Sequence, residues 1–179
     1  MATRRLAALL GSINVGGNRL RMADLRAALE AAGFTNVATV TASGNVLFDW
    51  PEEPDGALQT RLEEVLHGKF GIRSFAALRT RAELLSAVDD NPFAQDGEDK
   101  FVHTVFLEAP LDTARFEAFA AAYEGPERIA PGTREFYVDY AVGVGRSLLD
   151  PAMRKAKLVQ SRATARNVRS IRRIAEAMV

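Results

Sequence analysis

The stretch Leu6-Ala7-Ala8-Leu9-Leu10-Gly11-Ser12-Ile13-Asn14-Val15-Gly16-Gly17-Asn18 decides the fold of the N-terminal half of this chain. Its first five residues form an apolar run without polar alternation, which is typical of a central strand. The three glycines that follow permit positive φ angles and a close approach of the backbone. Farther on, apolar residues at helical spacing predict a helix that ends at Gly33. The stretch therefore predicts a strand, a glycine-rich loop and a helix in succession.

The glycine-rich loop admits two interpretations. N–H groups at the beginning of the helix would attract an anion, and the candidate ligand residues are Ser12, Asn14, Gly16, Gly17 and Asn18. The loop has neither the G-x-G-x-x-G pattern nor the P-loop pattern of nucleotide-binding proteins. The alternative is a tight strand-to-helix turn in which Asn14 and Asn18 bond to the backbone.

The rest of the first half continues the pattern. Residues 37–41 and 46–49 are expected to form a hairpin, a second helix holds the apolar positions between 58 and 70, and residues 71–78 form a further strand. The order strand, helix, strand, strand, helix, strand predicts the split β-α-β fold of ferredoxin-like domains, an antiparallel sheet with helices on one face.

This topology predicts where two polar loops lie. The first two strands are joined by a helix and therefore run parallel, so the end of the first strand and the hairpin after the second lie at the same edge of the sheet. Ser43 and Asn45 of the hairpin are thus expected beside Ser12 to Asn18. Such an arrangement is consistent with a polar ligand site, although hairpin turns use the same residues for conformational reasons.

The second half resembles the first loosely. Thr80-Arg81-Ala82-Glu83 fits a capping box and begins a short helix. Residues 100–107 and 134–139 are predicted strands, and Asp112 caps a helix between them. The acidic segment Asp96-Gly97-Glu98-Asp99 is interpreted as a solvated turn. We expect an α+β protein of two fused ferredoxin-like halves, residues 1–79 and 80–179, without a linker.

The end of the chain is strongly basic. From Arg154 onward there are eight basic residues and one acidic residue, whereas residues 1–150 carry 15 basic and 22 acidic residues. The zero net charge therefore hides about +7 on the tail and −7 on the rest of the chain, counted as formal charges. The spacing of Arg162, Arg166, Arg169 and Arg173 predicts one face of a basic C-terminal helix, with Thr164 as a candidate cap. Here the candidate ligand residues are Arg162, Thr164, Arg166 and Asn167.

Composition excludes several classes of chemistry. The chain of 179 residues is 47% hydrophobic and 26% charged, as expected of a globular protein. It contains no cysteine, which excludes disulfides, thiolate metal sites and a cysteine nucleophile. The two histidines have no local partner that would mark a base or a metal ligand, so we expect no metal and no cofactor. Neither a signal peptide nor a membrane-spanning run is visible, and we expect a cytoplasmic protein.

Six motifs are spread over nearly the whole chain: Ile13-Asn14-Val15-Gly16-Gly17, Met22-Ala23-Asp24-Leu25-Arg26, Gly33-Phe34, Ser43-Gly44-Asn45-Val46, Asn91-Pro92-Phe93 and Thr164-Ala165-Arg166-Asn167. Together they resemble the bacterial family catalogued as domain of unknown function 1697. Gly11-Ser12 stands where the family usually has Arg-Gly, and Val168 stands where it usually has Trp. The resemblance implies a fold and no established activity.

Three hypotheses for function remain. The first is a binding protein whose Gly/Asn loops and basic helix recognise a phosphate-bearing small molecule or nucleic acid. The second is an enzyme acting on a small phosphorylated or carboxylated molecule at the converging loops. In the third, the arginine face pairs with the chain's own acidic residues or with a second copy in a homodimer.

Overall fold

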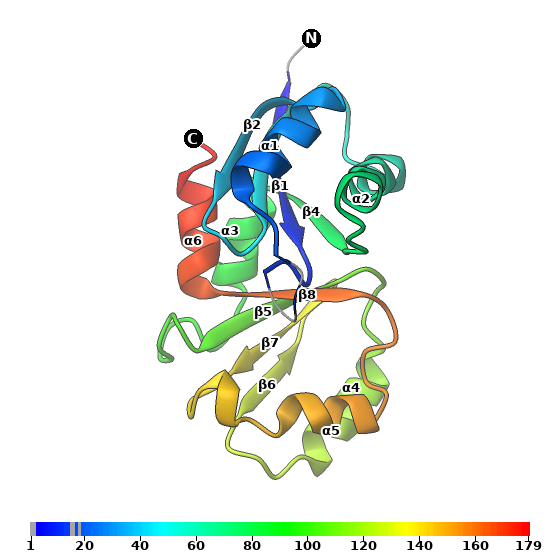
Figure 1. Cartoon of the computed structure of the whole chain (residues 1–179). Coiled ribbons are helices and arrows are strands. Elements are labelled where there is room, and N and C mark those ends of the chain that lie inside the picture. Colours follow the sequence, from blue (N-terminus) through cyan, green and yellow to red (C-terminus); the bar gives the residue numbers. More distant parts are fainter. Residues whose placement is uncertain (1–2, 15–16, 18) are drawn as a thin grey trace. The chain divides into compact units, whose positions relative to one another are not determined.

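The computed structural model describes residues 3–14, 17 and 19–179, and Figure 1 shows the course of the chain. The chain divides into two compact units, Met1–Leu84 with Arg173–Val179, and Leu85–Arg172. The boundary expected from the sequence lay between residues 79 and 80. In the described part of the chain, no helix is both long and apolar enough to cross a membrane.

The first unit is built on a four-stranded antiparallel sheet. The strands lie in the order β2-β3-β1-β4, so β1 is central and pairs with both β3 and β4. Two helices, α1 and α2, provide the crossovers. The elements are β1 Arg4–Leu10, α1 Met22–Ala31, β2 Thr35–Val40, β3 Asn45–Trp50, α2 Gly56–Phe70 and β4 Ala76–Thr80. These are the elements, in the order, that the sequence predicted.

The core of the first unit forms where one face of this sheet meets α1 and α2. Alternate residues of β1 point into it, and α2 contributes a row at helical spacing. Each large side chain that becomes fully buried contributes about 1.5–3 kcal/mol. The residues of β1 and α2 in this core are Leu6, Ala8, Leu10, Leu58, Leu62 and Leu66, all at most 3% exposed. Amphipathic spacing in the sequence thus accounts for the packing of both elements.

Local signals fix the ends of α2. At its N-terminus, the carboxylate of Asp55 accepts a hydrogen bond from the Leu58 N–H at 2.8 Å. At its C-terminus, Gly71 has a φ of 66°, the left-handed conformation that residues with a Cβ adopt at a cost. The helix therefore begins at a residue whose side chain can cap it and ends at a residue that tolerates a positive φ.

The second unit repeats the connectivity of the first. Its antiparallel strands lie in the order β6-β7-β5-β8, with β5 paired to both β7 and β8. Helix α3, Arg81–Asp89, precedes this sheet, and α6 follows it. The elements are β5 Val102–Leu107, α4 Thr113–Ala122, β6 Arg128–Pro131, β7 Glu135–Asp139, the 3-10 turn η1 Val144–Arg146, α5 Leu149–Lys155, β8 Ala163–Asn167 and α6 Val168–Glu176. The predicted α+β class, with two similar antiparallel halves and a C-terminal helix, is confirmed.

The predicted course of the basic tail is wrong in one respect. Residues 163–167 form strand β8 and not helix, so Arg162 and Arg166 do not share a helical face with Arg169 and Arg173. Thr164 lies within the strand, opposite Phe106 of β5, and caps no helix. The helical spacing of the arginines was coincidental. The residues of β8 alternate between buried and exposed, and the buried ones, Thr164 and Arg166, are polar.

The acidic segment 96–99 is also more than a solvated turn. Arg128 donates two hydrogen bonds to Asp96, at 2.9 and 3.0 Å, and further bonds to the buried carboxylate of Asp139. Its guanidinium also lies 4.7 Å from the ring centre of Phe93. These contacts hold the segment that follows Asn91-Pro92-Phe93 against β6 and β7.

Candidate functional site

The two Gly/Asn loops of the first unit meet at one end of its sheet, as the topology predicted. The Leu10 N–H donates to the Gly44 carbonyl oxygen at 2.9 Å. A Cβ at Gly44 would lie about 3.0 Å from Cβ of Ile13, so a side chain there would crowd the first loop. The loops are therefore packed against each other through the backbone and Ile13.

The Asn14 side chain holds this arrangement together. Its Nδ2 donates to the carbonyl oxygens of Ala42, at 2.6 Å, and Leu20, at 3.2 Å, while its Oδ1 accepts from the Leu20 N–H at 2.8 Å. Asn14 adopts a φ of 57°, which Asn tolerates better than most residues. All of these bonds are within the protein, as the strand-to-helix turn requires.

The hairpin residue Asn45 has a similar role. It is fully buried, and its Nδ2 lies 3.1 Å from three acceptors, the Val40 carbonyl oxygen and the hydroxyls of Thr41 and Ser43. These bonds close the hairpin between β2 and β3. The Asn45 side chain is buried and its Nδ2 bonds within the hairpin, as expected of a residue that closes a turn.

The other loop candidates are distributed as follows. Ser12, with a φ of 57°, Gly17 and Ser43 are exposed, and a Cβ at Gly17 would meet no atom within 4 Å. Gly16 and Asn18 lie outside the described residues. The ligand role of these loops stays a prediction.

The candidates near β8 are dispersed. Arg162 forms an ion pair with Glu108 at 2.6 Å. Arg166 is buried, donates to the hydroxyl of Thr164 and the carbonyl oxygen of Ala165, both at 2.8 Å, and burial lowers its pKa to about 10. Asn167 Oδ1 accepts from the Ser170 N–H at 2.8 Å and so caps the first turn of α6. Thr164 and Arg166 therefore meet on the buried face of β8, whereas Arg162 and Asn167 are bonded to other partners.

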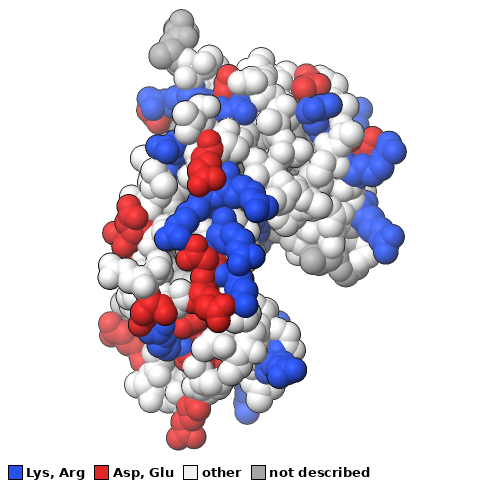
Figure 2. Space-filling view, turned by 90° about the vertical axis from the view of Figure 1, so that its left-hand side faces the viewer, with Lys and Arg blue, Asp and Glu red and all other residues white. Residues whose placement is uncertain are grey.

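Helix α6 has one apolar and one basic face. Val168, Ile171 and Ile174 are fully buried, whereas Arg169, Arg172 and Arg173 are exposed on the other side. This is the amphipathic pattern of a helix that packs on a core. Figure 2 views the side on which α6 lies in Figure 1, and there Lys and Arg side chains gather in a band with acidic side chains beside it.

The three exposed arginines of α6 differ in their partners. The Arg172 guanidinium donates to the carboxylate of Asp99. Within the described residues, Arg169 and Arg173 have no carboxylate within ion-pair distance. The C-terminal end of α6 has a further cation beside it, since Arg81 Nε donates to the Ala175 carbonyl oxygen at 3.0 Å. The helix therefore presents two arginines whose side chains are available to an external anion.

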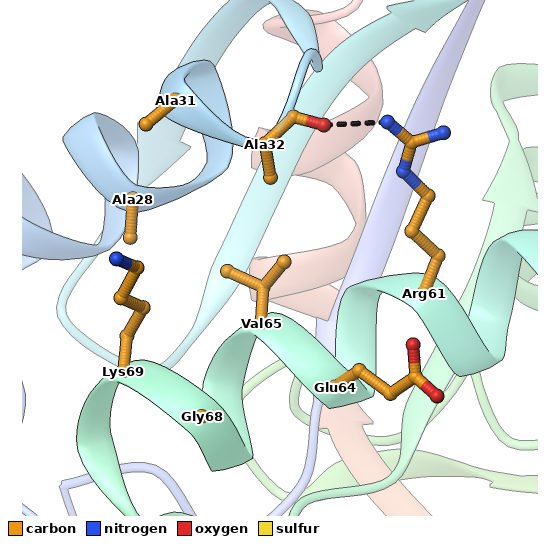
Figure 3. A pocket seen from close by; sticks show the side chains of 8 residues that line it. All are labelled: Ala28, Ala31, Ala32, Arg61, Glu64, Val65, Gly68 and Lys69. Carbon is orange, nitrogen blue, oxygen red and sulfur yellow. Dashed lines mark hydrogen bonds between the residues drawn. The ribbon is translucent and has the colours of Figure 1, made fainter.

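A surface groove of about 410 Å³ lies between α1 and α2 (Figure 3). Small residues line it, with charged residues of α2 at its rim. Arg61 is already engaged, because it donates to the Ala32 carbonyl oxygen at 2.6 Å and lies 5.4 Å from the ring centre of Trp50. The lining residues are Ala28, Ala31, Ala32, Arg61, Glu64, Val65, Gly68 and Lys69. The groove follows from the small residues where the two helices face each other.

The second unit contains a polar cluster that the sequence analysis did not identify. Tyr123 donates to the buried carboxylate of Glu127 at 2.5 Å, and Tyr140 donates to Asp150 at 3.0 Å. A Cβ at position 125 would overlap the Tyr123 ring, so this packing requires Gly125. Isolated carboxylates and tyrosines in a sequence give no signal that they meet. Among the described residues, no group of three or more His, Cys, Asp or Glu is arranged to hold a metal ion.

Comparison with known proteins identifies the family. The model of the family described as "Protein of unknown function (DUF1697)" matches residues 3–137. The chain belongs to this family. The matched residues include the Gly/Asn loops and Asn91-Pro92-Phe93 but end before α5, β8 and α6. No curated protein matches the chain.

A solved structure shows the same fold. It is described as that of the conserved bacterial protein SP0830 from Streptococcus pneumoniae, with 21% sequence identity and a TM-score of 0.74. The alignment covers 99% of each chain, so the likeness extends to both halves and to the C-terminal helix. At this identity the comparison shows the fold alone.

Proposed function

We propose that this DUF1697 protein is a cytoplasmic binding protein that recognises a phosphate-bearing ligand, with nucleic acid as the leading candidate, through the exposed face of α6. The observation that carries the proposal is the exposure of Arg169 and Arg173 without a carboxylate partner in the described part of the chain. Guanidinium groups match the geometry of phosphate oxygens and keep their charge at any physiological pH. The absence of cysteine agrees with a reducing compartment.

The packing of α6 supports a surface role for these arginines. Because Val168, Ile171 and Ile174 are fully buried, the helix has a fixed orientation and holds the opposite face toward solvent. Arg169 and Arg173 are one helical turn apart, about 6 Å along the axis. Arg172 contributes a third positive charge, although its pairing with Asp99 competes with an external anion.

The acidic residues of the chain limit the affinity. The protein has no net charge, and acidic side chains lie directly beside the basic band in Figure 2. Binding is therefore expected to be weak and strongly dependent on salt. If all three arginines contact phosphates, log affinity falls against log salt with a slope of about −2.7 for duplex DNA, since each contact contributes about −0.9.

The test is a titration of a short labelled DNA duplex at several salt concentrations, followed by fluorescence anisotropy. We expect R169A/R173A to weaken binding and to reduce the magnitude of the slope by about 1.8, the contribution of two contacts. The matched control is R154A/K155A, which removes two exposed charges of α5 from the same basic tail.

Two outcomes would contradict the proposal. One is a lack of binding by the wild-type protein even at low salt. The other is an equal loss of affinity in R169A/R173A and R154A/K155A, which would indicate a general effect of charge instead of a site on α6.

A further inference from the structure

Glu127 is an unusual acidic residue of the second unit, because it is only 6% exposed and has no cationic partner among the described residues. Its Oε2 accepts the hydrogen bond from Tyr123. Its Oε1 is buried and has no hydrogen-bond partner in the described part of the protein. A buried carboxylate oxygen without a partner is costly, so each such atom in a folded protein calls for an explanation.

Among the residues that the structure describes, the groups around Glu127 do not include a compensating cation. The hydroxyl groups of Ser147 and Tyr123 lower the pKa of Glu127, and the negative charge of Glu127 helps to raise the pKa of Tyr140. Asp150, which accepts from Tyr140, adds a second negative charge. Next to Tyr140 lies His103, and burial lowers the pKa of this histidine, which favours the neutral ring. Two carboxylates thus lie among neutral donors.

Glu127 retains its charge in this setting. Burial by itself would raise the pKa of Glu127, but the hydrogen bond from Tyr123 and the nearby Ser147 hydroxyl outweigh burial and keep the pKa below its ordinary value. Burial also raises the pKa of Tyr123 to about 12, so its hydroxyl remains a neutral donor at physiological pH. The cluster is therefore anionic under ordinary conditions.

The loop that contains Ser147 carries apolar side chains at the surface. Val142, Val144 and Leu148 are 49%, 46% and 74% exposed. Gly143 in the same loop has a φ of 87°, which a residue with a Cβ adopts only with strain. Three large apolar side chains exposed within seven residues form a surface that an apolar partner would cover.

We propose that Glu127 binds a primary ammonium group beneath the loop of residues 141–148, with the alkyl part of the ligand against Val142, Val144 and Leu148. An ammonium group has three N–H donors, which suit the unpartnered Oε1 and neighbouring hydroxyl oxygens. It also favours aromatic faces, and Tyr123 lies stacked on Phe119, with ring centres 5.5 Å apart. A metal ion fits less well, because no three-ligand group occurs among the described residues. The site is separate from α6.

The experiment measures the melting temperature of the full chain with n-butylammonium chloride. We expect a concentration-dependent rise, as mass action requires for a ligand of the folded state. n-Butanol, which has the same alkyl chain without the charge, and potassium chloride should give no such rise. The rise should disappear in E127Q and persist in E124Q, which neutralises an exposed carboxylate three residues earlier.

A second measurement guards against misfolding of E127Q. In the wild-type protein, butylammonium should shift the amide signals of Glu127 and Ser147 in a two-dimensional NMR titration and leave those of α1 unchanged. The proposal is overturned if these signals do not move. It is also overturned if potassium chloride gives the same thermal shift, or if E127Q responds like the wild type.

Discussion

The burial of His103 makes the stability of the folded protein depend on pH. Its Nδ1 lies 2.8 Å from the Phe101 carbonyl oxygen, and its ring meets Tyr140 edge to face, with centres 5.1 Å apart. Burial lowers its pKa, and the hydrogen bond with the Phe101 carbonyl oxygen and the charges of Asp150 and Asp139 oppose that shift only in part. The folded protein therefore binds the His103 proton less readily than the unfolded chain does.

This predicts a loss of stability on acidification. As pH falls below about 6.5, the unfolded chain takes up a proton at His103 that the folded state resists, so the free energy of unfolding decreases. Above that pH, neither state is protonated and His103 has no effect. Urea unfolding at about pH 5.5 and about pH 7.5 should show a smaller pH dependence in His103→Gln than in the wild type. The matched control, His67→Gln at an exposed position, should keep the wild-type dependence.

Asparagine residues illustrate what sequence alone can and cannot assign. The loop sequence predicted correctly that Asn14 and Asn45 come close to each other's loops. It left open whether their amides face a ligand or the backbone, because both uses favour the same residue types. In the structure, the Asn14 amide bonds to backbone groups of Ala42 and Leu20, which the sequence does not reveal. The alternative of an enzyme site at these loops stays a prediction.

At the scale of elements, the first half was predictable because its signals are redundant. Apolar periodicity predicted α2, and the capping box at Thr80 correctly begins α3. Gly71, which the sequence placed at the start of the next strand, ends α2 instead, and β4 begins at Ala76. The second half gives weaker signals. Strand β8 buries polar residues, and β6 is four residues long and ends in a proline. Hydrophobic periodicity cannot identify strands whose inward side chains are polar or whose length is so short.

The junction between β8 and α6 leads to a prediction at this scale. No residue separates the two elements. Asn167 ends β8, and its Oδ1 caps α6 while its Nδ2 donates to the Lys100 carbonyl oxygen at 3.3 Å. Asn167→Ala should lower the free energy of unfolding by about 1 kcal/mol. Asn167→Asp, which keeps the capping oxygen, should lose clearly less. Chemical denaturation measures both, and equal losses would show that the cap does not stabilise α6.

At the scale of the whole molecule, some arginines of the basic tail form ion pairs with acidic residues of the same chain. Arg162 pairs with Glu108, and Arg172 pairs with Asp99, so two tail arginines meet acidic residues of the preceding sequence. Exposed pairs of this kind contribute little to stability. They support the hypothesis that part of the arginine set is structural, while Arg169 and Arg173 are left for an external partner.

The first unit depends on the last residues of α6. Ile174, Ala175 and Met178 are at most 6% exposed, and all three belong to that unit together with Met1–Leu84. Deletion of residues 173–179 should remove about 3–6 kcal/mol of stability, from the burial of Ile174 and Met178 alone. Deletion of Val179, which is 98% exposed, is the control. Urea unfolding followed by circular dichroism measures the difference, and a seven-residue deletion as stable as the control would contradict the assignment.

The division of the first unit between two distant chain segments also bears on protein synthesis. A ribosome adds about 5–20 residues per second, and N-terminal domains usually fold while the rest of the chain is still being made. Here Met1–Leu84 can form its sheet early, but Ile174 and Met178 arrive only after the whole second unit has been translated. The nascent first unit must therefore wait for its final helix with an apolar surface uncovered.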